Sequence, residues 1–227
     1  MNNLTALTQI LDSAFPSGAF IHSFGLEAHI GFGVVNCASE LEVYLKNIVL
    51  DQYQKLEFPI AKSVYQQLAK NALAPIVKID VLLSSMLTFS YAKAYKTIGE
   101  NILAHIKSLP LSKDITKRYF DAAIDKITPC NEIVLLSVFA CDRSIDIKIF
   151  LALWCKKNLT SIALSALKIS KIKPSDIQRI LFSMDDFLSD RIDEALNAKA
   201  LKIANFNPLF DEVVYRHKLL ESKMFAT

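Results

Sequence analysis

Hydrophobic residues recur along this chain at intervals of three, four and seven positions, the spacing of one face of an α-helix. The clearest example extends from Leu41 to Ile60, where the apolar positions form one stripe on a single long helix. Pro59 is expected to kink this helix, because proline lacks the amide hydrogen that a helix interior uses. The strongly apolar segment from Ile145 to Leu167 predicts another helix.

Capping residues and prolines divide the remaining chain into further helical segments. Ser39 with Glu42, and Ser175 with Gln178, have the spacing of capping boxes, and Ser112 is placed to cap a shorter helix. The helix after Ser175 is expected to continue to about residue 197. Further breaks fall at Pro75, Pro110, Thr128–Pro129, Asp142–Ser144, Lys173–Pro174 and Asn207–Pro208.

Neither an alternating strand pattern of useful length nor an internal repeat is apparent. The 227 residues are enough to bury one substantial core, and no linker divides them. We therefore expect one all-α domain over residues 1–227, a bundle of roughly eight to ten helices.

The composition is unusually apolar for a chain of this kind. Hydrophobic residues make up 52% of the sequence, and the mean hydropathy is +0.29. A membrane span needs about 18 uncharged apolar residues, and each candidate run is interrupted by charge sooner. The apolar excess therefore predicts a deep helical core together with contacts to other chains, and no membrane association.

Charge and cysteine usage narrow the class of protein further. The net charge is only +3 and the lysines and arginines are scattered, so no nucleic-acid partner is expected. No signal-peptide pattern opens the sequence. The four cysteines lie far apart, and we expect them to be reduced, buried thiols of a cytoplasmic protein. They are Cys37, Cys130, Cys141 and Cys155.

Sequence motifs for catalysis are missing. The chain contains no phosphate loop, no dinucleotide fingerprint and no H-E-x-x-H. His22 and His29 stand seven residues apart, too far to share one ion on a straight helix, so we expect their neighbours or an interface to satisfy them. A transient metal contact is the alternative. We predict no enzyme activity, no resident metal and no cofactor.

One stretch, FPSGAFIHSFGLEAH at residues 15–29, is almost uncharged and contains two histidines and two glycines. Residues 16–18 have turn chemistry. Phe20 and Phe24 are four apart and would share a helical face, while Gly25 permits close backbone approach. Large apolar side chains beside small residues describe a contact surface better than a catalytic pocket. The alternative is that both phenylalanines are ordinary core residues.

This stretch resembles the N-terminal signature of the UreF family of urease accessory proteins. That signature has a leucine-rich first segment followed by P-x-G, an aromatic residue, H-S and G-L-E. The matching residues, in order, are Pro16, Gly18, Phe20, His22, Ser23, Gly25, Leu26 and Glu27.

Two further stretches resemble the same family. The C-terminal sequence FNPLFDEVVYRHKLLESKMFAT resembles the family's ending, with Pro208, Asp211, His217 and Phe225 in matching positions. A weaker likeness surrounds Gly99, in a helix of small residues.

The chain also departs from the family pattern, which marks it as a divergent member. Lys223 stands where the family usually has arginine, whose planar fork can bridge two acceptors as lysine cannot. In the middle of the chain, Glu132 and Ser137 replace a histidine and a glycine, and Lys173–Pro174 replaces a Gly-Gln pair. The partner contacts made through these middle positions are the ones that the departures call into question.

The resemblance implies an all-helical, non-enzymatic scaffold. UreF-like proteins bind a UreD-type accessory protein (also called UreH), dimerise and recruit the GTPase UreG, and the assembly delivers nickel as cargo to apo-urease. The C-terminal tail, about residues 208–227, is expected to become ordered on partner binding. The partner-binding residues implied are Phe20, His22, Ser23 and Glu27 near the N-terminus and His217, Lys223 and Phe225 in the tail.

Two alternatives stay open at this point. The chain could be a UreF-like helical interaction protein that serves a different partner, a reading that the divergent middle favours. It could instead be an unrelated helical ligand-binding protein or enzyme, which would need an apolar pocket lined by convergent polar groups.

Overall fold

The computed structural model describes residues 3–19, 22–199, 203–205, 212, 215, 224 and 225. These residues form α-helices and one π-helical segment, with no β-strand among them, so the all-α prediction is confirmed. In chain order the elements are α1 (Asn3–Leu11), α2 (Leu26–Gly31), α3 (Ala38–Ile48), η2 (Val49–Glu57), α4 (Phe58–Ala69), α5 (Leu73–Met86), α6 (Phe89–Ile106), α7 (Asp114–Ile124), α8 (Glu132–Asp142), α9 (Ile147–Ile169), α10 (Pro174–Ser183) and α11 (Asp185–Asn197).

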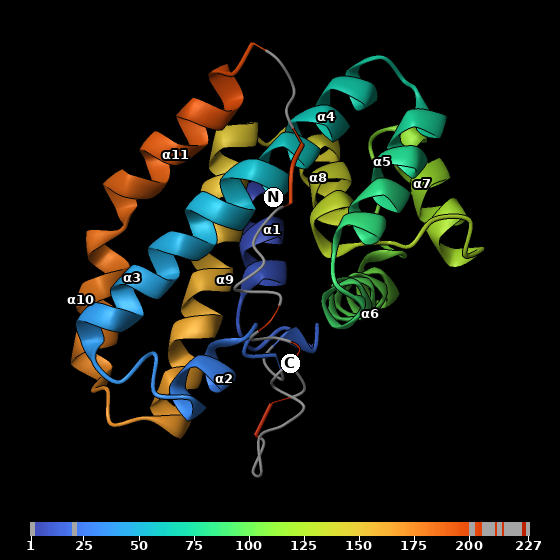
Figure 1. The fold of residues 1–227 in the computed structure, drawn as a ribbon. Helices are drawn as coiled ribbons and strands as arrows, with labels where there is room; N and C mark the ends of the chain where they lie inside the picture. Colours follow the sequence, from blue (N-terminus) through green and yellow to red (C-terminus); the bar gives the residue numbers. More distant parts are fainter. Residues whose placement is uncertain are drawn as a thin grey trace.

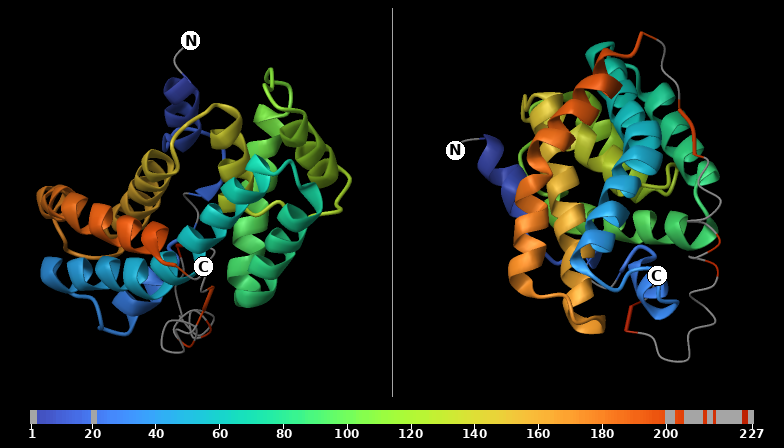
Figure 2. Two further views of the ribbon diagram at one scale, coloured as in Figure 1. Left: turned by 90° about the horizontal axis from the view of Figure 1, so that it is seen from above. Right: turned by 60° about the vertical axis from the view of Figure 1, so that its left-hand side comes forward.

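The helices form two groups joined by α4 (Figure 1). Helices α3, α9, α10 and α11 lie on one side, and α5, α6, α7 and α8 lie on the other (Figures 1 and 2). Helix α4 contacts members of both groups, packing on α5 and α8 and also on α9 and α11. The two groups therefore share one hydrophobic core.

Helices α8 and α9 supply the centre of that core. Nearly every residue of α8 is buried, which follows from its having no polar face. On α9 the single tryptophan, Trp154, is fully buried, and its ring packs edge-on against Tyr53 with 4.9 Å between centroids. Cys130 and Cys155 are buried as expected, whereas Cys141 is half-buried and Cys37 is exposed, so the prediction of four buried thiols is wrong for Cys37 and holds only in part for Cys141.

The helical stripe that begins at Leu41 continues without a break through α3, η2 and α4. Its central part, η2, has the wider turns of a π-helix, and Pro59 lies in the first turn of α4 directly after it. A π-helical turn inserts an extra residue into the ladder of backbone hydrogen bonds. The helix is therefore irregular near Pro59, as predicted, but the irregularity is a π-helical segment that ends just before the proline.

The predicted capping residues are replaced by others. Helix α3 begins at Ala38, two residues earlier than the Ser39 box requires, and the Glu40 carboxylate accepts the amides of Asn36 at 2.6 Å and Cys37 at 3.2 Å. Helix α10 begins at Pro174 with no side-chain cap, because proline at the first position needs no acceptor for an amide. The helix predicted to continue to residue 197 is divided at Met184.

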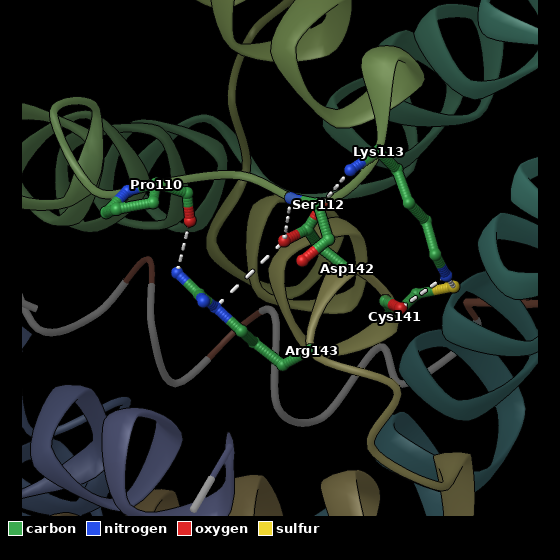
Figure 3. Close-up of polar contacts among 6 residues, drawn as sticks. All are labelled: Pro110, Ser112, Lys113, Cys141, Asp142 and Arg143. Atoms are coloured by element: carbon green, nitrogen blue, oxygen red, sulfur yellow. Dashed lines mark hydrogen bonds and ion pairs between the residues drawn. The ribbon is translucent and has the colours of Figure 1, made fainter. Parts of the chain in front are cut away.

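Ser112 does not cap α7 with its side chain. Its backbone amide instead donates to the carboxylate of Asp142, at 3.0 Å to each oxygen, and the amide of Lys113 donates to the same group at 2.8 Å (Figure 3). Arg143 completes the cluster by donating to the carbonyl of Pro110 at 2.7 Å. A carboxylate at the end of α8 therefore holds the start of α7.

A second buried carboxylate, Asp80 on α5, organises the loop between α7 and α8. It accepts hydrogen bonds from the hydroxyls of Tyr119 (2.9 Å) and Thr128 (2.5 Å), from the amide of Cys130 (2.8 Å), and from the amide and side chain of Asn131 (3.1 and 2.7 Å). Asp80 is fully buried, and burial raises its pKa while these donors oppose the rise.

Gly99 on α6 lets the same loop approach closely. A Cβ atom at this position would lie 1.8 Å from the carbonyl oxygen of Cys130, a separation that no side chain can adopt. The likeness to a helix of small residues at Gly99 thus has a packing cause. Since the Asp80 carboxylate holds the amide of Cys130 on the other side, the loop is fixed between α5 and α6.

Asp80→Ala is expected to lower the free energy of unfolding by about 3 kcal/mol, because it leaves several buried donors without an acceptor. Urea denaturation followed by circular dichroism measures the change. Asp125→Ala, at an exposed carboxylate near the same loop, is the matched control and should change stability by less than about 0.5 kcal/mol. Equal stabilities of the two variants would contradict the role given to Asp80.

Glu57, at the end of η2, is a fully buried carboxyl group. One of its oxygens accepts from Gln52 at 2.8 Å and from Tyr95 at 2.7 Å, while the other has no hydrogen-bond partner among the described residues. Burial raises the pKa of Glu57 to about 6. The folded protein therefore binds this proton more tightly than the unfolded chain does.

A carboxyl group whose pKa is raised on folding contributes stability at low pH that is lost as the pH rises through the folded-state value. For Glu57 the pKa rises from 4.5 in the unfolded chain to about 6 in the folded protein. This difference in pKa corresponds to about 2 kcal/mol of stability that is lost as the pH rises through this range. Between pH 4 and pH 7, Glu57→Gln should therefore gain up to about 2 kcal/mol of stability relative to the unaltered chain. Urea unfolding at both pH values measures it, and Glu194→Gln, exposed on α11, is the control. A gain no larger than in the control would show that Glu57 titrates normally.

Candidate functional site

The N-terminal motif packs against α3 and α6. Asn101 on α6 donates to the carbonyl of Ser17 at 3.1 Å, which attaches the turn at residues 16–18 to that helix. Phe24 is buried, and its ring lies 5.4 Å from that of Tyr91 and 6.2 Å from that of Tyr95. The sequence allows two interpretations of Phe24, as part of a contact surface or as an ordinary core residue, and the structure shows that it is a core residue.

The backbone turns sharply before α2. Gly25 has φ +86°, a left-handed conformation that glycine adopts without steric cost, and Phe24 also has a positive φ, of +48°. The hydroxyl of Tyr44 on α3 donates to the carbonyl of Phe24 at 2.8 Å and so supports the less favourable conformation. The turn aims the first residues of α2 into the protein.

Ser23 and Glu27 are both buried at this turn. The hydroxyl of Ser23 accepts the amide of Glu27 at 3.3 Å, which ties the motif to the first turn of α2. The Glu27 side chain, only 5% exposed, accepts two backbone amides from the far end of the chain, from Met224 at 2.6 Å and from Phe225 at 3.2 Å. One carboxylate oxygen serves each amide, so the group recognises a peptide backbone.

Phe225 is held by its ring as well as by its amide. The side chain is 7% exposed, and the ammonium nitrogen of Lys168 on α9 lies 5.4 Å from the ring centroid, within cation–π range. The structure thus brings together Glu27 and Phe225, which the sequence assigned to two separate patches. We call Glu27, Lys168, Met224 and Phe225 the tail clamp.

Of the two motif histidines, His22 is buried and His29 is half-buried. The ring of His22 lies 5.8 Å from Phe24, and His29 forms a hydrogen bond with the carbonyl of Gly25 at 2.9 Å while packing 4.7 Å from Tyr44. Burial lowers the pKa of both imidazoles, so both are neutral at pH 7. No group of three or more His, Cys, Asp and Glu suited to a metal ion occurs in the part of the chain that the structure describes.

Three predicted partner-binding residues, Phe20, His217 and Lys223, lie outside the described residues. The last predicted helix, after Asn207–Pro208, lies largely outside them as well. The partner-binding role of all seven residues stays a prediction, and His22, Ser23 and Glu27 are buried within this chain rather than presented on its surface.

The divergent middle residues fall into two environments. Glu132 is buried on α8 and forms an ion pair with Lys157 at 2.7 Å, and the hydroxyl of Ser137 donates to the carbonyl of Ile133 at 2.7 Å. These two replacements are therefore accommodated inside the core. Lys173 and Pro174 are exposed where α10 begins, so only this pair is available for contact with a partner in the chain as described.

Several supporting residues carry no signal in the sequence. Tyr44 is one member of a helical stripe, Asn101 is one polar residue on a long helix, and Lys168 is one of many scattered lysines. Their roles depend on contacts with residues about 20 to 85 positions away or, for Lys168, with the end of the chain. Only the motif residues themselves could be singled out beforehand.

The comparisons with known proteins agree with the architecture. Residues 35–185 match the family UreF, which covers more than half of the chain. This chain belongs to the UreF family. The family match and the resemblance of the N-terminal motif are complementary, because the motif precedes the matched residues.

Individual relatives of the chain are similar over nearly their whole length. It is 24% identical over 231 residues to "Urease accessory protein UreF" of Polynucleobacter asymbioticus, covering all of this chain and 98% of that protein. It is 23% identical to the protein of the same name from Bacillus sp. (strain TB-90), with full coverage of both, and 24% identical to "Urease accessory protein F" of Arabidopsis thaliana, with 96% and 90% covered.

Each helix within the described ranges is too short or too polar to cross a bilayer. The tail clamp is a contact between two distant segments of a UreF-family protein. It provides carboxylate oxygens for backbone amides and a cation for an aromatic face, which is chemistry suited to holding a peptide.

Glu27→Gln is expected to release the chain end, because an amide nitrogen replaces one of the two oxygens that accept the amides of Met224 and Phe225. Hydrogen–deuterium exchange of these two amides should accelerate about tenfold, corresponding to about 1.4 kcal/mol of lost protection. Asp190→Asn, exposed on α11, is the control and should leave their exchange unchanged. Unchanged exchange in Glu27→Gln would show that the carboxylate does not hold the tail.

Proposed function

We propose that this chain is a non-enzymatic scaffold of urease maturation, which links a UreD-type (UreH-type) accessory protein to a UreG-type GTPase for the insertion of nickel into apo-urease. The observation that supports this most directly is the tail clamp, in which the two family motifs meet at Glu27 and Phe225. The names of relatives that are similar over their full length, which are urease accessory proteins, support it independently.

The clamp gives a physical reason for both motifs to act in one interface. Terminal segments are usually poorly held, and here Met224 and Phe225 contact a buried carboxylate and a lysine. A partner that binds the tail would therefore also contact α2 and the motif before it. The residues proposed for this interface remain Phe20, His22, Ser23, Glu27, His217, Lys223 and Phe225.

The remaining parts of the proposal come from family membership. The chain would act in the cytoplasm as a homodimer within the complex, with apo-urease as its final client and with neither nucleic acid nor membrane as a partner. Nickel is the cargo of the assembly and not a resident cofactor of this chain.

One alternative function survives the comparisons. Family membership removes the unrelated helical enzyme or ligand-binding protein, but a UreF-like chain that serves a different metalloenzyme keeps a specific motivation, since Lys173 and Pro174 alter an exposed turn. Genome neighbours that encode urease subunits favour the first function, and their absence favours the second.

The experiment is co-purification of the chain with the UreD-type and UreG-type proteins of the same genome, with GTP and magnesium present, followed by light scattering. We expect a complex of defined mass that contains two copies of this chain and that activates apo-urease when Ni²⁺ is added. Removal of the residues after Leu220 should lower the complex yield about tenfold, since the tail clamp is lost, while the helical content stays the same.

Asp125→Asn, on the exposed surface near the end of α7, is the control and should assemble normally. A truncated chain that assembles at full strength would refute the role of the tail. Well-folded proteins that form no complex would refute the scaffold itself.

A further inference from the structure

An exposed apolar groove is lined by residues of α5, α6 and the loop between α7 and α8. Phe89, the first residue of α6, is 82% exposed, Ile127 in the α7–α8 loop is 63% exposed, and Val81 on α5 is 49% exposed. Together with Ala92 and Pro129 these residues line a hollow of about 540 Å³. Large apolar side chains gathered at an exposed hollow are typical of an interaction site.

The charged side chains that line the groove are all lysines. Lys93 and Lys96 follow Phe89 by four and seven residues on α6, so they share its helical face, and Lys126 closes the rim from the loop. Lys126 pairs with Glu100 at 2.6 Å, whereas Lys93 and Lys96 have no ion-pair partner within the described part of the chain. No carboxylate is among the described residues that line the hollow.

One wall of the groove is anchored by buried hydrogen bonds. Thr128 and Pro129 belong to the loop that Asp80 holds through the hydroxyl of Thr128 and the amide of Cys130. A preformed surface loses little conformational freedom on binding, which raises the affinity that a given contact area can supply. The groove is therefore suited to binding a short peptide segment without rearranging.

We propose that this groove docks an acidic segment of another protein, one that places apolar side chains against Phe89, Ile127 and Val81 and carboxylates against Lys93 and Lys96. A second copy of this chain fits poorly, because two lysine-rimmed faces would repel each other. An anionic membrane also fits less well, because two lysines attract an anionic surface only weakly and a hollow presents little area to a flat surface.

This proposal does not depend on the proposed role in urease maturation, because it concerns only the groove and the chemistry of the segment that binds there. The probe is a synthetic helical peptide with leucine at i, i+3, i+4 and i+7 and glutamate elsewhere, titrated into the methyl-labelled full chain and followed by nuclear magnetic resonance. We expect shifts at the methyl groups of Ile127 and Val81. The same peptide with lysine in place of glutamate should produce none.

Charge reversal and apolar truncation test the two halves of the groove separately. The double variant Lys93→Glu, Lys96→Glu should weaken binding of the acidic peptide about tenfold, and Phe89→Ser should weaken it by a similar factor. The controls are Lys171→Glu with Lys173→Glu, exposed before α10, and Phe182→Ser, exposed on α10. The control variants should bind as the unaltered chain does.

Four outcomes would overturn the proposal. The acidic peptide could leave the groove methyl groups unshifted or bind without dependence on Lys93 and Lys96. Vesicles of phosphatidylcholine and phosphatidylserine could shift the same methyl groups while the peptide does not, which would identify a membrane site. Sedimentation could show a concentration-dependent dimer that Phe89→Ser abolishes, which would identify the face as a contact between copies of this chain.

Discussion

The buried carboxylate of Asp80 is the interaction on which much of this structure depends. It lies at zero exposure on α5 and accepts hydrogen bonds from two hydroxyls, two backbone amides and one side-chain amide, all from α7 and the loop that follows it. A buried carboxylate is tolerated only when donors surround it, and here the donors are groups of a loop that would otherwise have no partners. The carboxylate therefore sets where α8 begins and how the most apolar helix of the core enters it.

The same device recurs at two other places. Asp142 holds the amides that precede α7, and Glu27 holds the amides of Met224 and Phe225. In each case a carboxylate on a helix accepts hydrogen bonds from backbone amides of a segment distant in the sequence. Helices therefore fix the position of non-helical segments. Glu57 differs, because one of its oxygens has no hydrogen-bond partner among the described residues and its raised pKa reflects that environment.

These anchored segments lie at the two surfaces that we propose for partner contacts. Glu27 of the N-terminal motif holds the amides of Met224 and Phe225 in this UreF-family protein. Asp80 fixes the loop that forms one wall of the groove near Phe89. Surfaces that are already shaped before a partner arrives bind at a lower entropic cost.

The sequence by itself determined the helical class, most helix positions and the identity of the N-terminal motif, because hydrophobic periodicity and short motifs are local properties. Which polar residues cap and anchor was decided only in the tertiary structure. Ser112 and Asp142 lie 30 positions apart, and Glu27 and Phe225 lie 198 positions apart. The burial of Glu132 beside Lys157 and the exposure of Phe89 likewise depend on which helix covers which face. The local sequence pattern limits the kinds of group that a residue can contact. The distant segment that it actually contacts is determined by the packing of the helices.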